Sequence, residues 1–269
     1  MFAVSFRAEP AMSRSPKMPV RTRRITRVAI CAMWMSLLTG CGEVWTDPLS
    51  TAVEYDKGLV VMYPGALVSD SEMLGFWGTF RLAGVNQAIE VAQWTTPRSY
   101  EIDAVAANQS SRASAPVEAE RLAEYIRSHP NSPVTLLGYS AGAMYAIMVA
   151  EAMPPDAPLD KLILLSSSVS HQYDLVPALD HTRSGAFAYW SPNENTLRLL
   201  IAILGTTDLT HDPAAGYTGF DTVDPRLTQL KWTPEMETQY GQPGEHSAYL
   251  YNLGWIADYI VPNVPRTKP

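Results

Sequence analysis

The chain is poor in cysteine and in long apolar runs. Its 269 residues include two cysteines, Cys31 and Cys41, so a scaffold held together by several disulfides is excluded. After residue 40 no stretch reaches the roughly 18 consecutive apolar residues typical of a membrane-spanning helix. Cys or His spacings typical of zinc sites and glycine-rich phosphate loops are also missing. The sequence therefore predicts a globular body that needs no metal and no other cofactor.

Positive charge is scarce beyond the first 40 residues. Those residues hold seven Lys or Arg and one acidic residue, Glu9. Of the 20 basic and 27 acidic residues in the whole chain, 13 and 26 remain, which gives the rest of the protein a net charge of −13. Such a body repels phosphate backbones, so a nucleic-acid partner is not expected.

The first 41 residues have the pattern of an export signal. A basic segment, Arg21 to Arg27, precedes an eleven-residue apolar run, Val28 to Leu38, which is the length of a signal-peptide core. Leu38-Thr39-Gly40-Cys41 then resembles the lipobox of bacterial lipoproteins. The resemblance implies cleavage before Cys41, lipidation of its thiol, and a protein anchored to the membrane of the bacterial cell envelope. The alternatives are an ordinary secretory signal or a short membrane anchor with an incidental cysteine.

This pattern divides the chain into four parts. Residues 1–40 are expected to be the signal peptide, with Met12 and Met18 as alternative starts. Residues 41–54 contain few large apolar side chains and are expected to form a lipidated tether. A single folded domain is expected over 55–262, followed by a tail over 263–269.

One stretch, Pro133 to Met153, has the pattern of a nucleophile elbow. An apolar strand-like run leads into Gly138-Tyr139-Ser140-Ala141-Gly142, and a small, apolar, helix-favouring segment follows. Glycines two positions before and after the serine allow the strand and the helix to approach closely. The pattern predicts that Ser140 projects from the end of the sheet beside a helix N-terminus, where it would act as a nucleophile. A plain strand-helix turn is the alternative.

Strand-like and helix-like segments alternate through the domain. Apolar runs predict buried strands at 58–63, 134–137, 162–165 and 186–190. An alternating run at 88–94 predicts a strand nearer the sheet edge, and a weak strand is expected at 228–233. Helices are predicted at 72–83, 117–126, 143–153 and 248–260, a helix or lid segment at 197–204, and a loop at 95–115. This alternation predicts an α/β fold with a mostly parallel sheet and helices on both faces.

Residues 55–262 resemble the α/β-hydrolases, the superfamily of lipases, esterases, thioesterases and some peptidases. The resemblance is carried by Leu59-Val60-Val61-Met62-Tyr63-Pro64-Gly65-Ala66, by the elbow, and by a late histidine in Gly244-Glu245-His246. It implies the α/β-hydrolase fold, with Ser140 as nucleophile and His246 as the base. His171, which follows the strand predicted at 162–165, is an alternative base.

The resemblance also implies an acid and an oxyanion hole. The acid usually follows the strand after 162–165, where Glu194 stands although most of the superfamily has Asp; Asp174 and Asp208 are the alternatives. The backbone N–H groups of Ala141 and of Ala66, with Gly65 as its neighbour, are the expected oxyanion donors.

Together these features predict a serine hydrolase that cleaves a small-molecule acyl substrate without a cofactor. Carboxylesterase or lipase activity is the leading prediction, and thioesterase or peptidase activity is the alternative. A catalytically silent lipoprotein of the same fold, which binds a ligand or partner, is the competing hypothesis.

Overall fold

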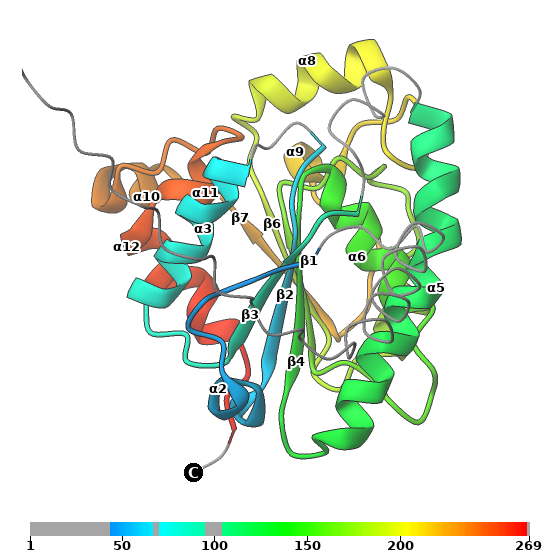
Figure 1. The fold of residues 1–269 in the computed structure, drawn as a ribbon. Coiled ribbons are helices and arrows are strands. Elements are labelled where there is room, and N and C mark those ends of the chain that lie inside the picture. The colour runs from blue at the N-terminus through cyan, green and yellow to red at the C-terminus, as the bar shows by residue number, and fades with distance from the viewer. Residues whose placement is uncertain (1–43, 67–69, 95–103, 268–269) are drawn as a thin grey trace, which may run out of the picture. The chain divides into compact units, whose positions relative to one another are not determined.

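A computed structural model describes residues 44–66, 70–94 and 104–267, all within the unit Cys41–Pro269. The segment predicted as a signal peptide and the predicted lipidation site, Cys41, lie outside the described residues. In the described part the strands form a single sheet (Figure 1), in the order β1-β3-β2-β4-β5-β6-β7. The strands are β1 (Val44–Thr46), β2 (Leu59–Tyr63), β3 (Ala88–Ala92), β4 (Val134–Tyr139), β5 (Lys161–Leu165), β6 (Ala186–Trp190) and β7 (Leu227–Lys231).

The sheet is parallel from β3 to β7, and β1 alone runs antiparallel, along the outer edge of β3. Because the parallel strands point the same way, their carboxyl ends meet at one edge. Tyr63 of β2 pairs with Gly138 of β4, and Tyr139 of β4 pairs with Leu165 of β5. The segments that follow these three strands therefore lie beside one another.

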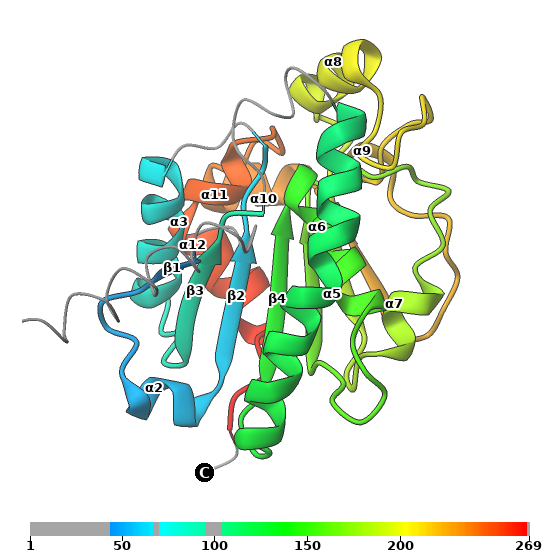
Figure 2. The same ribbon diagram turned by 45° about the vertical axis from the view of Figure 1, so that its right-hand side comes forward.

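Helices cover both faces of the sheet, as the two views in Figures 1 and 2 show. One face packs against α5 (Ala104–Ser128), α6 (Ala141–Glu151) and α7 (Val176–Asp180). The other packs against α3 (Asp70–Leu82), α10 (Pro234–Tyr240), α11 (Ala248–Tyr251) and α12 (Leu253–Trp255). The predicted α/β architecture, with a mostly parallel sheet covered on both faces, is confirmed.

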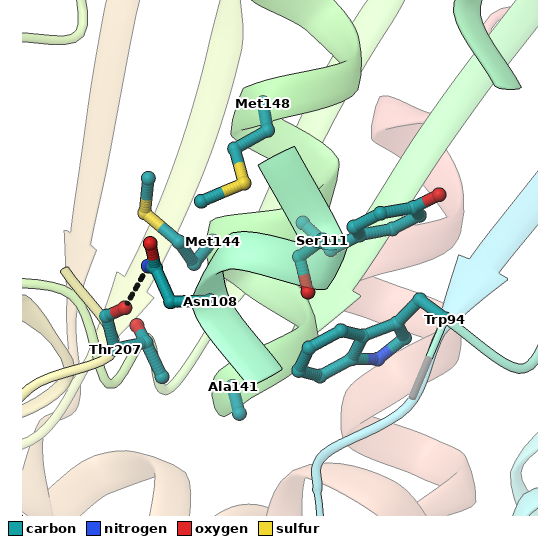
Figure 3. Close-up of a pocket in the computed structure, with 8 residues that line it drawn as sticks. Trp94, Asn108, Ser111, Ala141, Met144, Met148 and Thr207 are labelled. Atoms are coloured by element: carbon teal, nitrogen blue, oxygen red, sulfur yellow. Dashed lines mark hydrogen bonds between the residues drawn. The ribbon is translucent and has the colours of Figure 1, made fainter. Parts of the chain in front are cut away.

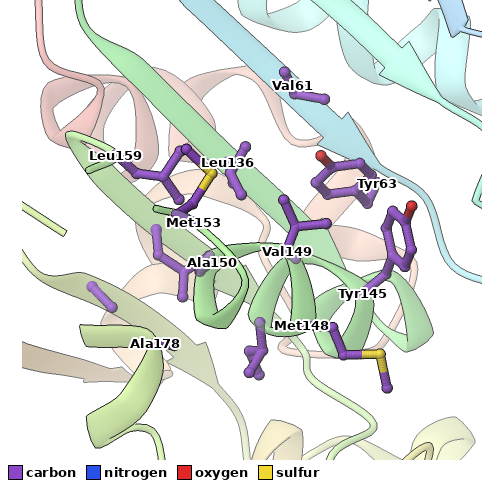
Figure 4. Close-up of a cluster of buried hydrophobic side chains, with 14 of the residues drawn as sticks. Val61, Tyr63, Leu136, Tyr145, Met148, Val149, Ala150, Met153, Leu159 and Ala178 are labelled. Carbon is purple, nitrogen blue, oxygen red and sulfur yellow. The ribbon is translucent and has the colours of Figure 1, made fainter. Parts of the chain in front are cut away.

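The central strand β4 and the helix α6 form the middle of the core. Every residue of β4 is buried, which explains its continuous apolar run, because a strand covered on both faces has no polar side. The first ten residues of α6 are buried as well. Figure 4 shows part of this cluster, where Val61 and Leu136 of the sheet meet Val149 and Ala150 of α6. The elbow thus connects a fully buried strand to a helix whose first ten residues are buried.

The prediction of a loop over 95–115 is wrong for residues 104–115, which form the first half of α5; residues 95–103 lie outside the described part. This half of the helix contains few large apolar residues, so periodicity gives no signal. It is rich in alanine, the residue with the highest helix propensity. Ala107, Asn108 and Ser111 are buried there by neighbouring elements.

Strand β3 is buried more completely than its alternating pattern predicts. All five of its residues are buried, because β3 lies between β1 and β2 and its apolar side chains pack into the core clusters on both faces of the sheet. The acidic residue in this alternation, Glu90, forms an ion pair with Arg121, with nitrogen and oxygen 2.9 Å apart, and accepts a hydrogen bond of 2.7 Å from Tyr55 Oη. The polar side chain is therefore buried with partners rather than exposed to solvent.

Much of the segment expected as a tether is folded onto the domain. Residues Val44–Thr46 form β1, and the helix α2 (Ala52–Lys57) begins at a capping box made by Thr51 and Glu54. Between these elements, the fully buried carboxylate of Asp47 pairs with Arg81 of α3. A free linker would contain neither a strand paired in the sheet nor a buried, paired carboxylate such as that of Asp47. The chain is therefore part of the folded domain from residue 44 onward.

The closing helix predicted over 248–260 is interrupted. It consists of α11, α12 and a π-helical turn, Ile256–Ile260. Asn252 leaves the helical conformation between α11 and α12, and its side chain accepts a hydrogen bond of 3.0 Å from the N–H of Trp255. This local capping competes with a continuous helix.

The segment 197–204, predicted as a helix or a lid, is the helix α8 (Asn195–Leu204). Leu197 and Ile201 are buried beneath it, whereas Leu199 and Ile203 are 62% and 69% exposed. In the views of Figures 1 and 2, α8 lies beyond the carboxyl ends of the strands. No helix in the described ranges is both long and apolar enough to cross a membrane.

Candidate active site

Ser140 occupies the turn between β4 and α6 in a strained backbone conformation. Its φ of 54° and ψ of −120° lie in a region that non-glycine residues rarely adopt. The turn is also extremely tight. A Cβ placed on Gly142 would lie 2.2 Å from the carbonyl oxygen of Tyr63, and one on Gly138 would lie 2.5 Å from Cα of Ala143. Only glycine fits at these two positions, which explains the spacing of the motif around Ser140.

The three predicted residues Ser140, His246 and Glu194 are brought together in one hydrogen-bonded chain. His246 Nε2 lies 3.0 Å from Ser140 Oγ, and His246 Nδ1 lies 3.0 Å from Glu194 Oε2. The residues come from three separate segments: the turn after β4, the turn after β6 and the loop before α11. Their chain order, Ser, acid, His, is the order found in α/β-hydrolases.

The hydrogen bonds define the protonation of the imidazole. An ionised Glu194 carboxylate can only accept, so the Nδ1 atom of His246 carries the proton. Nε2 is then free to accept the hydroxyl proton of Ser140. Glu194 is fully buried, and this burial raises the pKa of its carboxyl above the ordinary value, while the hydrogen bonds from His246 and Ser166 act in the opposite direction. The site thus holds a buried carboxylate whose charge is stabilised by the imidazole it orients.

A fourth side chain, Ser166, joins this chain of hydrogen bonds. Its hydroxyl donates to Glu194 Oε1 and lies 2.7 Å from His246 Nδ1. Because that nitrogen carries the proton, Ser166 Oγ is the acceptor of this second bond. Ser166 is completely buried and has a φ of 47°. It therefore contacts both members of the acid-base pair from the end of β5.

Hydrogen bonds connect the segments that carry Glu194 and His246. Asn193 Nδ2 donates to the carbonyl of Pro243 over 3.0 Å, and Asn195 Nδ2 donates to Glu245 Oε1 over 2.9 Å. The residue before the serine contributes as well. Tyr139 Oη donates to the backbone carbonyl of His246 over 3.1 Å, with ring centroids 5.0 Å apart. The elbow and both loops are thus fixed in relation to one another.

The alternative acids have other partners. Asp174 is exposed and accepts a hydrogen bond of 3.0 Å from the N–H of Val176 at the start of α7. Asp208 accepts one of 2.9 Å from the N–H of Ser170. The structure therefore places Glu194, rather than either aspartate, against the imidazole of His246.

The alternative base is also occupied elsewhere. His171 Nδ1 lies 3.0 Å from the exposed carboxylate of Asp221. The histidine that the structure brings to Ser140 is His246.

The predicted oxyanion donors lie next to one another. Ala66 and Ala141 pack in one small buried cluster with Ala107. Ala141 is the first residue of α6, so its N–H has no acceptor within the helix. Gly65 belongs to the same turn as Ala66, and this turn is pressed against the start of α6, as the close approach of Gly142 to the carbonyl of Pro64 shows.

Sequence reasoning missed Ser166 as part of the site. It belongs to a run of three serines at the end of β5, which carries no motif. The signal that could have found it is topological: β5 lies beside β4 in the sheet, so the residue after its last position must lie beside Ser140.

The strand order, the serine turn after β4 and the order of the three residues are those of the α/β-hydrolase fold.

No family model matches the chain, and no curated protein is similar to it in sequence. Among solved structures, Aspergillus fumigatus lipase B is 13% identical with a TM-score of 0.49, over 84% of this chain and 57% of that one. A lipase-esterase related protein from Clostridium acetobutylicum is 10% identical with a TM-score of 0.45, over 84% of this chain and 100% of that one. The type II thioesterase YbtT is 15% identical with a TM-score of 0.46, over 82% of this chain and 98% of that one. At these identities and TM-scores the likenesses carry no conclusion about the activity of this chain.

Proposed function

We propose that the protein is a serine hydrolase that cleaves carboxylic ester or thioester bonds through an acyl-enzyme on Ser140. The observation that carries the proposal is the continuous chain from Ser140 Oγ through His246 to the buried Glu194, with two distances of 3.0 Å. A serine hydroxyl is a weak nucleophile at neutral pH and needs an adjacent base. His246 is in position to supply that base, and Glu194 to hold its tautomer.

In the first half of the reaction, Ser140 Oγ attacks the carbonyl carbon while its proton moves to His246 Nε2. The negative charge that develops on the carbonyl oxygen is stabilised by the N–H groups of Ala141 and Ala66. The bond from the carbonyl carbon to the alcohol oxygen or thiol sulfur then breaks. His246 gives its proton to that leaving group, and the acyl group remains on Ser140.

In the second half, water attacks the acyl-enzyme and loses a proton to His246 Nε2. The bond to Ser140 Oγ breaks, and the hydroxyl recovers its proton from His246. The balance is one ester and one water consumed, with one carboxylic acid and one alcohol released. Glu194 remains ionised throughout, because it stabilises the imidazolium without taking its proton.

The proposal is tested with p-nitrophenyl esters and the purified domain, residues 42–269. The wild type is expected to release p-nitrophenol, and Ser140→Ala and His246→Ala are each expected to lose at least about 10³-fold in kcat. Circular dichroism and thermal melting establish that the variants are folded. Equal, background release by all three proteins would instead support a silent binding module of the same fold.

We also propose that the hydrolase is exported and held at the cell envelope by lipid on Cys41. The support is the order of basic segment, apolar run and Leu38-Thr39-Gly40-Cys41 in the sequence. Two residues separate Cys41 from β1, so the acylated cysteine would be at most about 10 Å from the first strand. Lipid anchoring would therefore hold the β1 edge of the sheet close to the bilayer.

This second proposal is tested in bacteria that express the full chain. The bacteria are grown in medium that contains an alkyne-labelled fatty acid. The wild type should carry the label and sediment with membranes, whereas Cys41→Ala should lose the label. Labelling of both proteins, or of neither, would contradict lipidation at Cys41.

A further inference from the structure

The helix α8 exposes an apolar face to solvent. Leu199 and Ile203 are four residues apart, so they lie on one face of the helix, and both are largely exposed. Leu204, next to Ile203, is exposed as well. Among the side chains that the structure describes, no other helix exposes more than one large apolar residue. Single exposed apolar side chains are ordinary, whereas a group of them on one helix indicates an interaction surface.

The opposite side of α8 is packed on the domain. Leu197 and Ile201 are buried there in a small apolar cluster. The segment after the helix is held by two hydrogen bonds. Asn108 Nδ2 of α5 donates to the carbonyl of Thr207 over 2.7 Å (Figure 3), and the N–H of Thr207 donates to the carbonyl of Ser168 over 3.0 Å. The apolar face therefore stands on a helix that is fixed from behind.

The same helix contains no acidic residue. This is true of all 10 residues of Asn195–Leu204, although the chain beyond residue 40 has a net charge of −13. The one ionisable side chain in the helix, Arg198, donates to the carbonyl of Pro192 over 3.0 Å, and its guanidinium carbon lies 5.1 Å from the ring centre of Tyr217. The apolar face can thus leave water without carrying an unpaired carboxylate with it.

The described chain begins at the same edge of the sheet. Strand β1 runs antiparallel to β3, and its first residue, Val44, pairs with Ala92, the last residue of β3. Ala92 therefore lies at the carboxyl ends of the parallel strands, where the turn of Ser140 is found and beyond which α8 lies (Figures 1 and 2). Cys41 precedes Val44 by three residues, a reach of at most about 10 Å. Lipid on Cys41 would enter the bilayer beside this edge.

The anchor and the apolar face of α8 lie at different points along that edge. Strand β6, which precedes α8, is five positions from β1 in the sheet, or about 24 Å at the usual strand spacing. Strand β4, which leads to Ser140, lies between them. Contacts at both points would restrict the tilt of the protein on a membrane and turn the edge with Ser140 toward it.

The size of the apolar face favours a bilayer over a protein partner. A stable protein interface buries about 800 Å² on each partner, which three side chains do not supply. A bilayer held nearby by the anchor needs only a weak second contact, because the anchor makes that contact intramolecular. We propose that Leu199, Ile203 and Leu204 insert into the surface of the bilayer that carries the Cys41 anchor. This proposal rests on the proposed anchor and not on the hydrolase chemistry.

The full chain, produced in bacteria and reconstituted with phosphatidylcholine vesicles, tests this orientation. Ile203→Cys is labelled with a thiol-reactive NBD fluorophore, and phosphatidylcholine with a spin label on its acyl chain is the quencher. Val53→Cys is the matched control, because Val53 is an exposed residue of α2, which lies at the end of the sheet opposite α8 in Figures 1 and 2. The label at position 203 should shift to the blue and lose at least about half of its emission to the quencher. The label at position 53 should do neither.

A charge on the same face provides a second variant. Leu199→Asp, added to Ile203→Cys, should abolish the quenching, whereas Val53→Asp added to it should not. Equal quenching at positions 203 and 53, or none at 203 in vesicle-bound protein, overturns the docking of α8 and leaves the anchor standing. A blue shift at 203 without quenching indicates a protein on this face and overturns it as well. A mature protein whose mass shows no acyl group on Cys41 refutes the anchor and the orientation together.

Discussion

The hydroxyl of Ser166 lies 2.7 Å from Nδ1 of His246 while it donates to Glu194. The proton on Nδ1 is thus shared between the carboxylate of Glu194 and the Ser166 oxygen. The two contacts fix the imidazole plane as well as its tautomer. In the proposed hydrolase, Ser166 is therefore expected to be a positioning residue, which acts through His246 and Glu194.

Ser166→Ala is expected to lower kcat by about 10- to 100-fold with little change in KM, since a hydrogen bond to a charged group is worth about 1.5–3 kcal/mol. Ser166→Gly is the matched control, because glycine adopts the φ of 47° without strain. If the hydroxyl matters, both variants slow equally although the glycine protein is more stable. Recovery of kcat in Ser166→Gly would show instead that only the backbone matters.

Glu194→Gln is expected to lower activity strongly while the protein remains folded. It should lower kcat by about 10³- to 10⁴-fold, because a neutral amide no longer stabilises the imidazolium or holds its tautomer. Asp174→Asn and Asp208→Asn, which change the other two carboxylates in the same way, should retain wild-type kcat. If Asp174→Asn or Asp208→Asn lost most of its kcat while Glu194→Gln remained active, that aspartate would be the acid instead of Glu194.

The stability of Glu194→Gln should depend on pH relative to the wild type. Burial raises the native pKa of Glu194 above its ordinary value of 4.5, so ionisation favours the unfolded chain. The wild type therefore loses stability as pH rises from 4.5 through the native pKa, whereas glutamine does not titrate. The difference in Tm, variant minus wild type, should increase between pH 4 and pH 8. A constant or decreasing difference contradicts a raised pKa.

Gly142→Ala is expected to abolish activity, because the added Cβ would overlap the backbone carbonyls of Tyr63 and Pro64. The turn that carries Ala66 must then move away from the start of α6. Gly78→Ala in α3 is the control, since a Cβ there meets nothing within 4 Å. That change should stabilise the protein by about 0.5–1 kcal/mol and leave kcat unaltered. Full activity in Gly142→Ala would contradict the tight elbow.

Arg81→Ala is expected to lower the free energy of unfolding by about 3–5 kcal/mol, because it leaves the buried carboxylate of Asp47 without its partner. Arg127→Ala removes an exposed arginine that pairs with Asp156 and Glu120. Its cost should be about 0–1 kcal/mol. Urea unfolding of both variants measures the difference. Equal, small losses would show that the segment around Asp47 does not contribute to the domain's stability.

Secondary structure is predicted best from the sequence where a local pattern alone, such as a buried apolar run or a pair of glycines, determines it. The bounds 186–190 are reproduced and 58–63 is one residue too long, because both strands are mostly buried apolar runs followed by turn residues. The elbow is predictable because the backbone packs so closely at positions 138 and 142 that only glycine fits there, and the two glycines are visible in the sequence. Residues 104–115 and the strand β1 were not predictable, because their structure depends on tertiary burial and strand pairing rather than on periodicity.

The same distinction applies to the site. Ser140 and His246 stand in recognisable surroundings, so their approach could be expected from the order of the segments. Glu194 could be ranked but not separated from Asp174 and Asp208, since only the path of each loop decides which carboxylate reaches the imidazole. Ser166 has no sequence signature, and its part in the site follows from the neighbourhood of β4 and β5.

The central claim is that Ser140 is an activated nucleophile, and covalent labelling tests it most directly. The folded domain is treated with a fluorophosphonate, digested, and mapped by mass spectrometry. The account predicts one stoichiometric adduct, located on Ser140, which forms in the wild type and is lost in Ser140→Ala. An unmodified Ser140 in the folded wild-type protein, or an adduct that persists in Ser140→Ala, would contradict it.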